Sequence, residues 1–162
     1  MYRVGIIVAS DKGSTGARVD TSGEIIRDIM TDNGYHVLEK VIVPDDIEAL
    51  SSVMSKWSDD NFVDLILTTG GTGFAKRDVT PEATKQVIEK QVPGFSELMR
   101  AESLKITKKA VLSRGISGIR KFTLIINMPG SPKAVKESLG FVLSALDHGL
   151  KILVGEASEC AR

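Results

Sequence analysis

The most distinctive chemistry in the sequence lies in a run of threonine and glycine after an apolar segment. Residues 69–73 read Thr-Gly-Gly-Thr-Gly, and Lys76, Arg77 and Asp78 follow closely. Glycines at this density let backbone amides approach an anion. The run matches neither the dinucleotide-binding pattern nor the Walker pattern. It is consistent with an unusual phosphate-binding turn, and the glycines alone fit a simple tight turn equally well.

The three charged residues after this run strengthen the phosphate interpretation. Lys76 and Arg77 bring two cations to the edge of the turn, and Asp78 adds a carboxylate. Cations bind phosphate oxygens directly, and a carboxylate together with phosphates is a common arrangement around Mg²⁺. Taken alone, Lys76 and Arg77 would more simply be a solvated charged pair.

A second carboxylate pair follows Pro44. Asp45 and Asp46 come directly after an apolar run, and Glu48 lies three residues beyond Asp45. That spacing is typical of a helix cap, which is the simpler role for Asp45. Asp45 would also lie within reach of Asp78 if their strands are neighbours, so the two could hold one divalent cation. Both roles are compatible.

Two further segments supply donors for an anion. Residues 129–133 place a glycine, the hydroxyl of Ser131 and the amine of Lys133 at a predicted helix start, where free amides attract negative charge. Simple capping by Ser131 is the alternative. Residues 10–16, which begin with Ser10 and Asp11, are flexible by composition. They could close over a ligand or form a long surface turn.

The elements that position these segments are predicted from apolar runs at 4–9, 37–43, 62–69 and 122–127. Three of the runs are nearly continuous and β-branched, as in parallel strands that are buried on both faces. Segments with helical spacing lie between them. We therefore expect an α/β fold, a three-layer sandwich in which helices flank a mostly parallel central sheet.

Helix boundaries follow from capping residues and prolines. We expect starts at Thr21, Asp45, Thr80 and Ser131, with a long terminal helix over about 133–153. Pro93 and Gly94 should break the third helical region in two. Residues 110–112 fit an extra short strand before a glycine-rich turn at 115–118. In such a sheet, ligands bind beyond the carboxyl ends of the strands, so the four polar segments should converge on one composite site.

Composition excludes several classes of protein. The 162 residues predict a single domain over 1–162, and 21 basic against 21 acidic residues argue against nucleic acid as the main partner. No apolar run is long enough for a membrane span, no signal peptide is evident, and the lone Cys160 fits a reducing compartment. We therefore expect a cytoplasmic protein. The zero net charge combines an acidic segment, 1–73, with a basic one, 74–121.

Three motifs resemble one family. Residues 67–84 read Leu-Thr-Thr-Gly-Gly-Thr-Gly-Phe-Ala-Lys-Arg-Asp-Val-Thr-Pro-Glu-Ala-Thr, 112–114 read Leu-Ser-Arg, and 125–132 read Ile-Ile-Asn-Met-Pro-Gly-Ser-Pro. Together they are similar to the molybdopterin adenylyltransferases, which include the bacterial Mog proteins and the G domains of gephyrin and the plant Cnx proteins. The resemblance covers about 4–153. Phe74 and Lys76 depart from many bacterial members, which have Pro and Arg there.

The resemblance implies a molybdopterin-binding domain, usually trimeric, that acts in molybdenum cofactor biosynthesis. Such an enzyme transfers AMP from Mg-ATP to the terminal phosphate of molybdopterin and releases pyrophosphate. It implies Asp45 and Asp78 as catalytic residues and as ligands of Mg²⁺. The implied substrate-binding residues are Ser10, Asp11, Thr69, Gly70, Gly71, Thr72, Gly73, Lys76, Arg77, Pro129, Gly130, Ser131 and Lys133.

The resemblance also implies a separate MoeA-type protein that inserts molybdate. The related MoaB-type proteins share much of the motif, so the alternative is a molybdopterin-binding or scaffold protein without transferase activity. A more distant alternative is an unrelated nucleotide-binding regulator on a similar sheet. No Ser, Cys or His lies where a nucleophile or strong base would be expected: His36 falls near a predicted strand start and His148 on the terminal helix.

Overall fold

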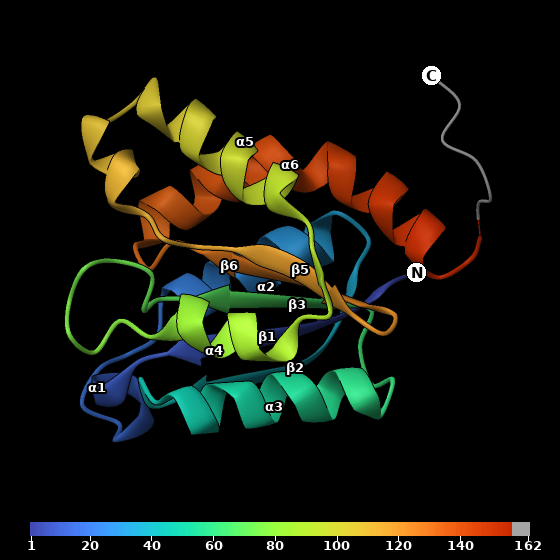
Figure 1. Cartoon of the computed structure of the whole chain (residues 1–162). Helices are drawn as coiled ribbons and strands as arrows, with labels where there is room; N and C mark the ends of the chain where they lie inside the picture. Colours follow the sequence, from blue (N-terminus) through green and yellow to red (C-terminus); the bar gives the residue numbers. More distant parts are fainter. Residues whose placement is uncertain (157–162) are drawn as a thin grey trace.

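The computed structural model describes residues 1–156, so Cys160 lies outside the described residues (Figure 1). Within that range the chain forms one six-stranded sheet with the order β2-β1-β3-β6-β5-β4. The strands are β1 (Arg3–Ala9), β2 (His36–Val43), β3 (Leu65–Thr69), β4 (Lys90–Gln91), β5 (Ser117–Arg120) and β6 (Thr123–Met128). The first four strands in the spatial order run parallel, and β5 runs antiparallel to both of its neighbours.

Helices cover both faces of this sheet. They are α1 (Asp11–Ser14), α2 (Ser22–Asp32), α3 (Ile47–Asp59), α4 (Thr80–Val87), α5 (Pro93–Leu104) and α6 (Pro132–Leu153), with a 3₁₀ helix at Lys108–Leu112. Figure 1 shows α5 and α6 on one side of the sheet and α3 and α4 on the other. Side chains of β1 alternate between the two cores: Ile6 packs towards α2 and α6, and Ile7 towards α3. The expected three-layer α/β fold is confirmed.

The connections open a crevice at one edge of the sheet. The chain leaves β1 through α2 to reach β2, and it returns through α3 on the opposite face to reach β3, which pairs with the other side of β1. Loops that diverge to opposite faces leave space beyond the carboxyl ends of β1 and β3. This crevice is where the sequence predicts the site.

One local expectation is wrong. Residues 110–112 form no strand but belong to the 3₁₀ helix, whose first turn is capped by the hydroxyl of Thr107 as it accepts from the amide of Lys109 at 3.3 Å. The strand instead begins at Ser117, inside the expected glycine turn, because that segment pairs with β6. Gly118 suits this strand, since a Cβ there would meet Ile88 at 2.6 Å.

Three of the four expected helix caps differ in the structure. Asp46, not Asp45, caps α3 by accepting from the amide of Ala49 at 2.8 Å. The hydroxyl of Thr21 makes no capping bond, and Asp20 accepts from the amide of Gly23 at 2.8 Å instead. Thr80 is the first helical residue of α4 rather than its cap. Ser131 caps α6 as expected.

The basic excess in residues 74–121 is not gathered at the crevice. Arg77 pairs with Asp11 next to the crevice, whereas Arg120 and Lys121 both pair with Asp59 at the end of α3 that faces away from it. The basic excess in sequence therefore does not translate into a single cationic face. No helix within residues 1–156 is both long and apolar enough to cross a membrane.

The cluster of Asp59, Arg120 and Lys121 gives a pH prediction. The hydrogen bond from Arg120 is the largest cause that lowers the pKa of Asp59 from 3.8 to about 2. A depressed pKa contributes stability that is present above about pH 4 and lost as the pH falls towards about 2. Replacing Asp59 by Asn should therefore destabilise the protein at about pH 6 but have little effect at about pH 2. Urea unfolding of both proteins across this range measures the difference, and a constant difference would contradict the pairing.

Candidate functional site

A cavity of about 690 Å³ occupies the crevice at the carboxyl ends of the strands. We call it the carboxyl-edge cavity. It brings together residues from all four polar segments singled out in the sequence. The predicted residues that line it are Ser10, Asp11, Asp45, Thr69, Gly70, Gly71, Asp78, Gly130 and Ser131.

Asp45 is held at the cavity by the first loop. Its Oδ2 accepts from the amide of Asp11 at 3.0 Å, and its own amide donates to Oδ1 of Asp11, also at 3.0 Å. Because Asp46 supplies the helix cap, the Asp45 carboxylate is available for a ligand. Burial raises the pKa of Asp45, and the nearby negative charges of Asp11 and Asp78 raise it further.

Asp78 is oriented by its own turn, because its Oδ2 accepts from the amide of Ala75 at 3.0 Å. Within residues 1–156, the second carboxylate oxygen of Asp78 has no hydrogen-bond donor, and the same holds for Oδ1 of Asp45. Each carboxylate thus keeps one oxygen available on the same cavity. No group of three or more acidic, His or Cys side chains gathers as a metal site in this part of the chain.

The predicted cations lie outside the cavity lining. Arg77 makes a bidentate ion pair with Asp11, with both nitrogen-to-oxygen distances at 2.9 Å, and so ties the glycine loop to the first loop. This pair is the main cause that lowers the pKa of Asp11. Lys76 and Lys133 are exposed. Direct contact of these three residues with a ligand therefore remains a prediction.

The glycine loop owes its shape to two residues in the left-handed region. Gly70 has φ +91° and Gly71 has φ +66°. The hydroxyl of Thr80 donates to the carbonyl of Gly70 at 2.9 Å, and the amide of Thr80 donates to the carbonyl of Gly71 at 3.1 Å. The start of α4 thereby fixes the turn between β3 and the cavity.

Gly70 allows a matched test of this turn. A Cβ at Gly70 would lie 2.5 Å from the carbonyl oxygen of Ala9, whereas Gly16, with φ +75°, has nothing within 4 Å of such an atom. Gly16→Ala should cost about 1 kcal/mol of unfolding free energy from backbone strain alone. Gly70→Ala should cost more, by about 1–3 kcal/mol, through the added clash. Equal losses in urea unfolding would show that the close approach to Ala9 is unimportant.

Arg114 fixes the outer half of the loop. Its amide donates to the carbonyl of Thr72 at 2.9 Å, its Nε to the carbonyl of Gly73 at 2.6 Å, and its Nη2 to the carbonyl of Asp78 at 2.7 Å. Its guanidinium also pairs with Glu82 on α4, which lowers the pKa of that carboxyl. Thr72 and Gly73 are not part of the cavity lining, and Arg114 holds both of their carbonyls. The sequence analysis placed Arg114 in a family motif, residues 112–114, but assigned it no role.

Two more hydrogen bonds join the last polar segment to the site. The hydroxyl of Thr69 donates to the carbonyl of Pro129 at 2.7 Å, and that of Ser22 donates to the carbonyl of Gly130 at 2.8 Å. These bonds set the position of the loop before α6. Ser22 was not predicted, and neither were Lys12, Arg18, Val19 and Asp20, which also line the cavity.

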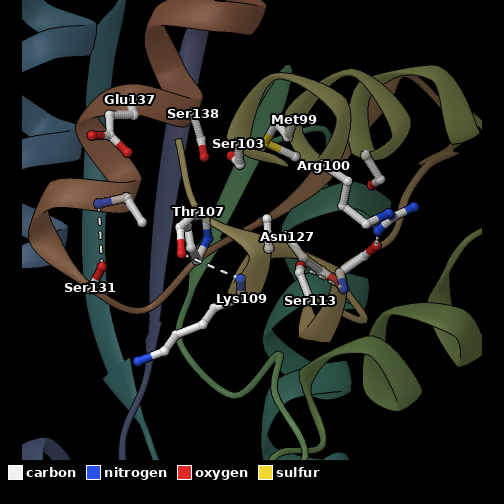
Figure 2. Close-up of a pocket in the computed structure, with 15 residues that line it drawn as sticks. Met99, Arg100, Ser103, Thr107, Lys109, Ser113, Asn127, Ser131, Glu137 and Ser138 are labelled. Atoms are coloured by element: carbon white, nitrogen blue, oxygen red, sulfur yellow. Dashed lines mark hydrogen bonds between the residues drawn. The ribbon is translucent and has the colours of Figure 1, made fainter. Parts of the chain in front are cut away.

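A second cavity of about 270 Å³ lies between α5, the 3₁₀ helix and the start of α6 (Figure 2). We call it the α5–α6 cavity. Its walls include Met99, Ala110, Pro129 and Ala134. Ser131 lines both cavities, so they meet at the amino terminus of α6. Apart from residues 129–131, its lining had not been connected with a site.

The doubly wound sheet, the glycine loop and the two carboxylates at its carboxyl edge are typical of α/β proteins that bind phosphate-bearing ligands. Comparison with known proteins identifies the family within this class. The chain belongs to the family described as the probable molybdopterin binding domain, whose model matches residues 5–148.

Individual relatives agree with this assignment. A molybdopterin adenylyltransferase of Helicobacter pylori strain J99 is 43% identical over 94% of this chain and 88% of its own. The molybdopterin adenylyltransferase of Escherichia coli K12 is 39% identical over 88% of this chain and 74% of its own. The crystal structure of the molybdopterin biosynthesis enzyme MoaB from Thermus thermophilus superposes with a TM-score of 0.90, at 47% identity, over 96% of this chain and 98% of its own.

Proposed function

We propose that this protein is a molybdopterin adenylyltransferase of molybdenum cofactor biosynthesis. It would transfer AMP from ATP to the terminal phosphate of molybdopterin. The relatives from Helicobacter and Escherichia carry this activity in their names. The structural observation that carries the proposal is the pair of carboxylates, Asp45 and Asp78, which face one cavity beside a glycine loop.

The reaction joins two anions, so the chain must position them and offset their charge. A terminal phosphate oxygen of molybdopterin attacks the α-phosphorus of ATP. The bond between that phosphorus and the oxygen that bridges it to the β-phosphorus breaks, and pyrophosphate leaves. We propose that amides of the glycine loop, of which Gly70 and Gly71 line the cavity, and of the first turn of α6 hold phosphate oxygens. No protein nucleophile is required, because the attacking oxygen belongs to the substrate.

Asp45 and Asp78 fit a magnesium ion that arrives with ATP. Mg²⁺ is commonly held by one or two carboxylates together with substrate phosphates, and each of these residues keeps one carboxylate oxygen without a donor in the described chain. When bound, the ion would neutralise phosphate charge during transfer. The pKa of Asp45, which is raised first by burial and then by the charges of Asp11 and Asp78, also fits such a role, because a bound cation would stabilise the ionised carboxylate.

A second candidate is a MoaB-type protein that binds molybdopterin without transferring AMP. The similarity to the MoaB structure is the observation that favours this second function. Pyrophosphate release distinguishes the two functions: the transferase should release pyrophosphate from Mg-ATP only when molybdopterin is present. Tight binding of molybdopterin with no pyrophosphate release would support the binding protein instead.

The family resemblance also supports an oligomeric state, a cellular location and a protein partner. We propose that the protein forms a homotrimer in the cytoplasm and passes its product to a separate MoeA-type protein that inserts molybdate. Light scattering after size-exclusion chromatography should give about three times the mass of one chain. A monomer at micromolar concentration would contradict the trimer.

A further inference from the structure

Two cations from the segment between β1 and α2 line the carboxyl-edge cavity. They are Lys12, which lies on α1, and Arg18, which follows that helix, and we call them the first-loop cations. We infer that they bind the β- and γ-phosphates of ATP and hold the pyrophosphate that leaves. This inference rests on the proposed function and assigns the leaving group its own subsite. Figure 1 shows α1 at the same end of the sheet as the loop between β3 and α4.

The first-loop cations are available to an anionic ligand. Within residues 1–156, no other lysine or arginine is among the residues that line this cavity. The side chains of Lys12 and Arg18 make no ion pair or hydrogen bond in the described chain, whereas Arg77 is committed to Asp11. A free guanidinium or amine at a cavity wall can bind phosphate oxygens without first breaking a contact within the protein.

The acidic groups of the cavity increase the need for such cations. Asp45 and Asp78 line it, and each has one carboxylate oxygen without a donor in the described chain. Asp11 and Asp20 also line it, and each has a cationic partner. The polyphosphate of ATP brings further negative charge into the same space, where repulsion would oppose its binding. The first-loop cations offset that repulsion from another wall of the cavity.

The segment that carries both cations is anchored at its two ends. At its start, Asp11 exchanges hydrogen bonds with Asp45. At its end, Asp20 accepts from the amine of Lys40 at 2.7 Å and from the amide of Gly23 at 2.8 Å. The side chains of Asp20 and Lys40 are both largely buried, so this second anchor is protected from water. The anchors keep the first-loop cations beside the cavity.

Between the anchors, Arg18 and Val19 are held by few contacts. Neither residue makes a hydrogen bond, through backbone or side chain, within the range 1–156, and Val19 is 86% exposed. A stretch without hydrogen bonds can shift towards a ligand at a low cost in free energy. The guanidinium of Arg18 can therefore close on a phosphate and withdraw again.

Fixed and movable walls suit different phosphates. The attacking phosphate must be held in line with the α-phosphorus, which requires groups in fixed positions, such as the glycine loop and the start of α6. The leaving pyrophosphate gains negative charge as its bond to the α-phosphorus breaks, and it must then depart. Cations on a movable stretch can stabilise that charge and release the product when the stretch opens. The first-loop cations therefore fit the β- and γ-phosphates.

Titration calorimetry with inorganic pyrophosphate and Mg²⁺, without molybdopterin, tests this subsite directly. We expect the Kd of pyrophosphate to rise about tenfold in Lys12→Gln and in Arg18→Gln, because each variant loses one charge-assisted hydrogen bond. The Kd of AMP should stay within about twofold, since AMP lacks the β- and γ-phosphates. Arg18→Lys, which keeps the charge, should recover part of the affinity. Lys90→Gln, at an exposed lysine on the edge strand β4, is the matched control and should change neither Kd.

Steady-state kinetics separate this subsite from the rest of the reaction. In both Gln variants the KM for ATP should rise about tenfold, while the KM for molybdopterin stays within about twofold. Both side chains are exposed and unpaired in the described chain, so urea unfolding should show wild-type stability. Unchanged pyrophosphate affinity in both variants, an equal loss of affinity for AMP, or a rise in the KM for molybdopterin alone would overturn the assignment. Pyrophosphate binding that depends on these residues, without pyrophosphate release from Mg-ATP and molybdopterin, would support the subsite and reject the transferase.

Discussion

Asp78→Asn is expected to lower the rate of adenylyl transfer by about 100-fold or more, the size of effect seen when one preorganised charge is removed from a transition state. The variant should fold normally, because the Asn oxygen can still accept from the amide of Ala75 as Asp78 does. It loses the negative charge beside the phosphates and with it the oxygen available to Mg²⁺. Steady-state pyrophosphate release with saturating molybdopterin measures the effect.

Asp46→Asn is the matched control for the loss of a single charge. Asp46 is exposed, directly follows Asp45, and caps α3 through a carboxylate that Asn can replace. Its activity should remain within about twofold of wild type. Full activity of a normally folded Asp78→Asn variant would show that the assignment of Asp78 as a catalytic carboxylate is wrong.

Arg114→Ala should produce the second largest effect, a fall in kcat of about 10- to 100-fold. The change removes the bonds from its guanidinium to the carbonyls of Gly73 and Asp78 and to the Glu82 carboxylate. Small displacements of groups that orient substrates have effects of this size. Stability should fall by about 1–3 kcal/mol as well, because partly buried acceptors lose their donor.

Arg120→Ala separates the effect on the loop from the effect on stability. Arg120 also combines a bidentate carboxylate pair, with Asp59, and a bond to a backbone carbonyl, that of Val87, but it lies at the opposite edge of the sheet. The Arg120→Ala variant should have a lower free energy of unfolding than the wild type and an unchanged kcat. Arg114→Lys should restore part of the stability but little kcat, since one amine cannot bridge the same acceptors. Equal kcat values for the two alanine variants would reject a positioning role for Arg114.

The sequence was sufficient for the main elements because burial on both faces leaves a clear pattern. The runs that became β1, β3 and β6 are rich in apolar and β-branched residues, and those strands are buried along nearly their whole length. β4 and β5 were not predicted, because two to four residues carry too little pattern and Ser117 and Gly118 are common in turns. Their strand geometry depends on pairing with β6, a contact distant in the chain.

The candidate site was predictable to the level of loops. Parallel strands bring the ends of β1, β2, β3 and β6 to one edge, so Ser10, Asp45 and Asp78 had to lie near one another. Which aspartate caps α3 was not predictable, because Asp45 and Asp46 differ by one residue and helix boundaries shift by that much. The structure assigns the cap to Asp46.

The contacts of Arg114 could not be predicted for a different reason. Arg114 acts on carbonyls 36 and 41 residues away in the chain, and carbonyls leave no sequence signal. Functional contacts that depend on packing between distant elements appear only in three dimensions.

The most direct test of the central claim is product analysis after incubation with molybdopterin, Mg²⁺ and ATP labelled at the α-phosphorus. If the protein is the transferase, the label should appear in adenylyl-molybdopterin in a one-to-one ratio with pyrophosphate, and omission of molybdopterin should abolish both products. Bound molybdopterin with all of the label remaining in ATP would contradict the claim.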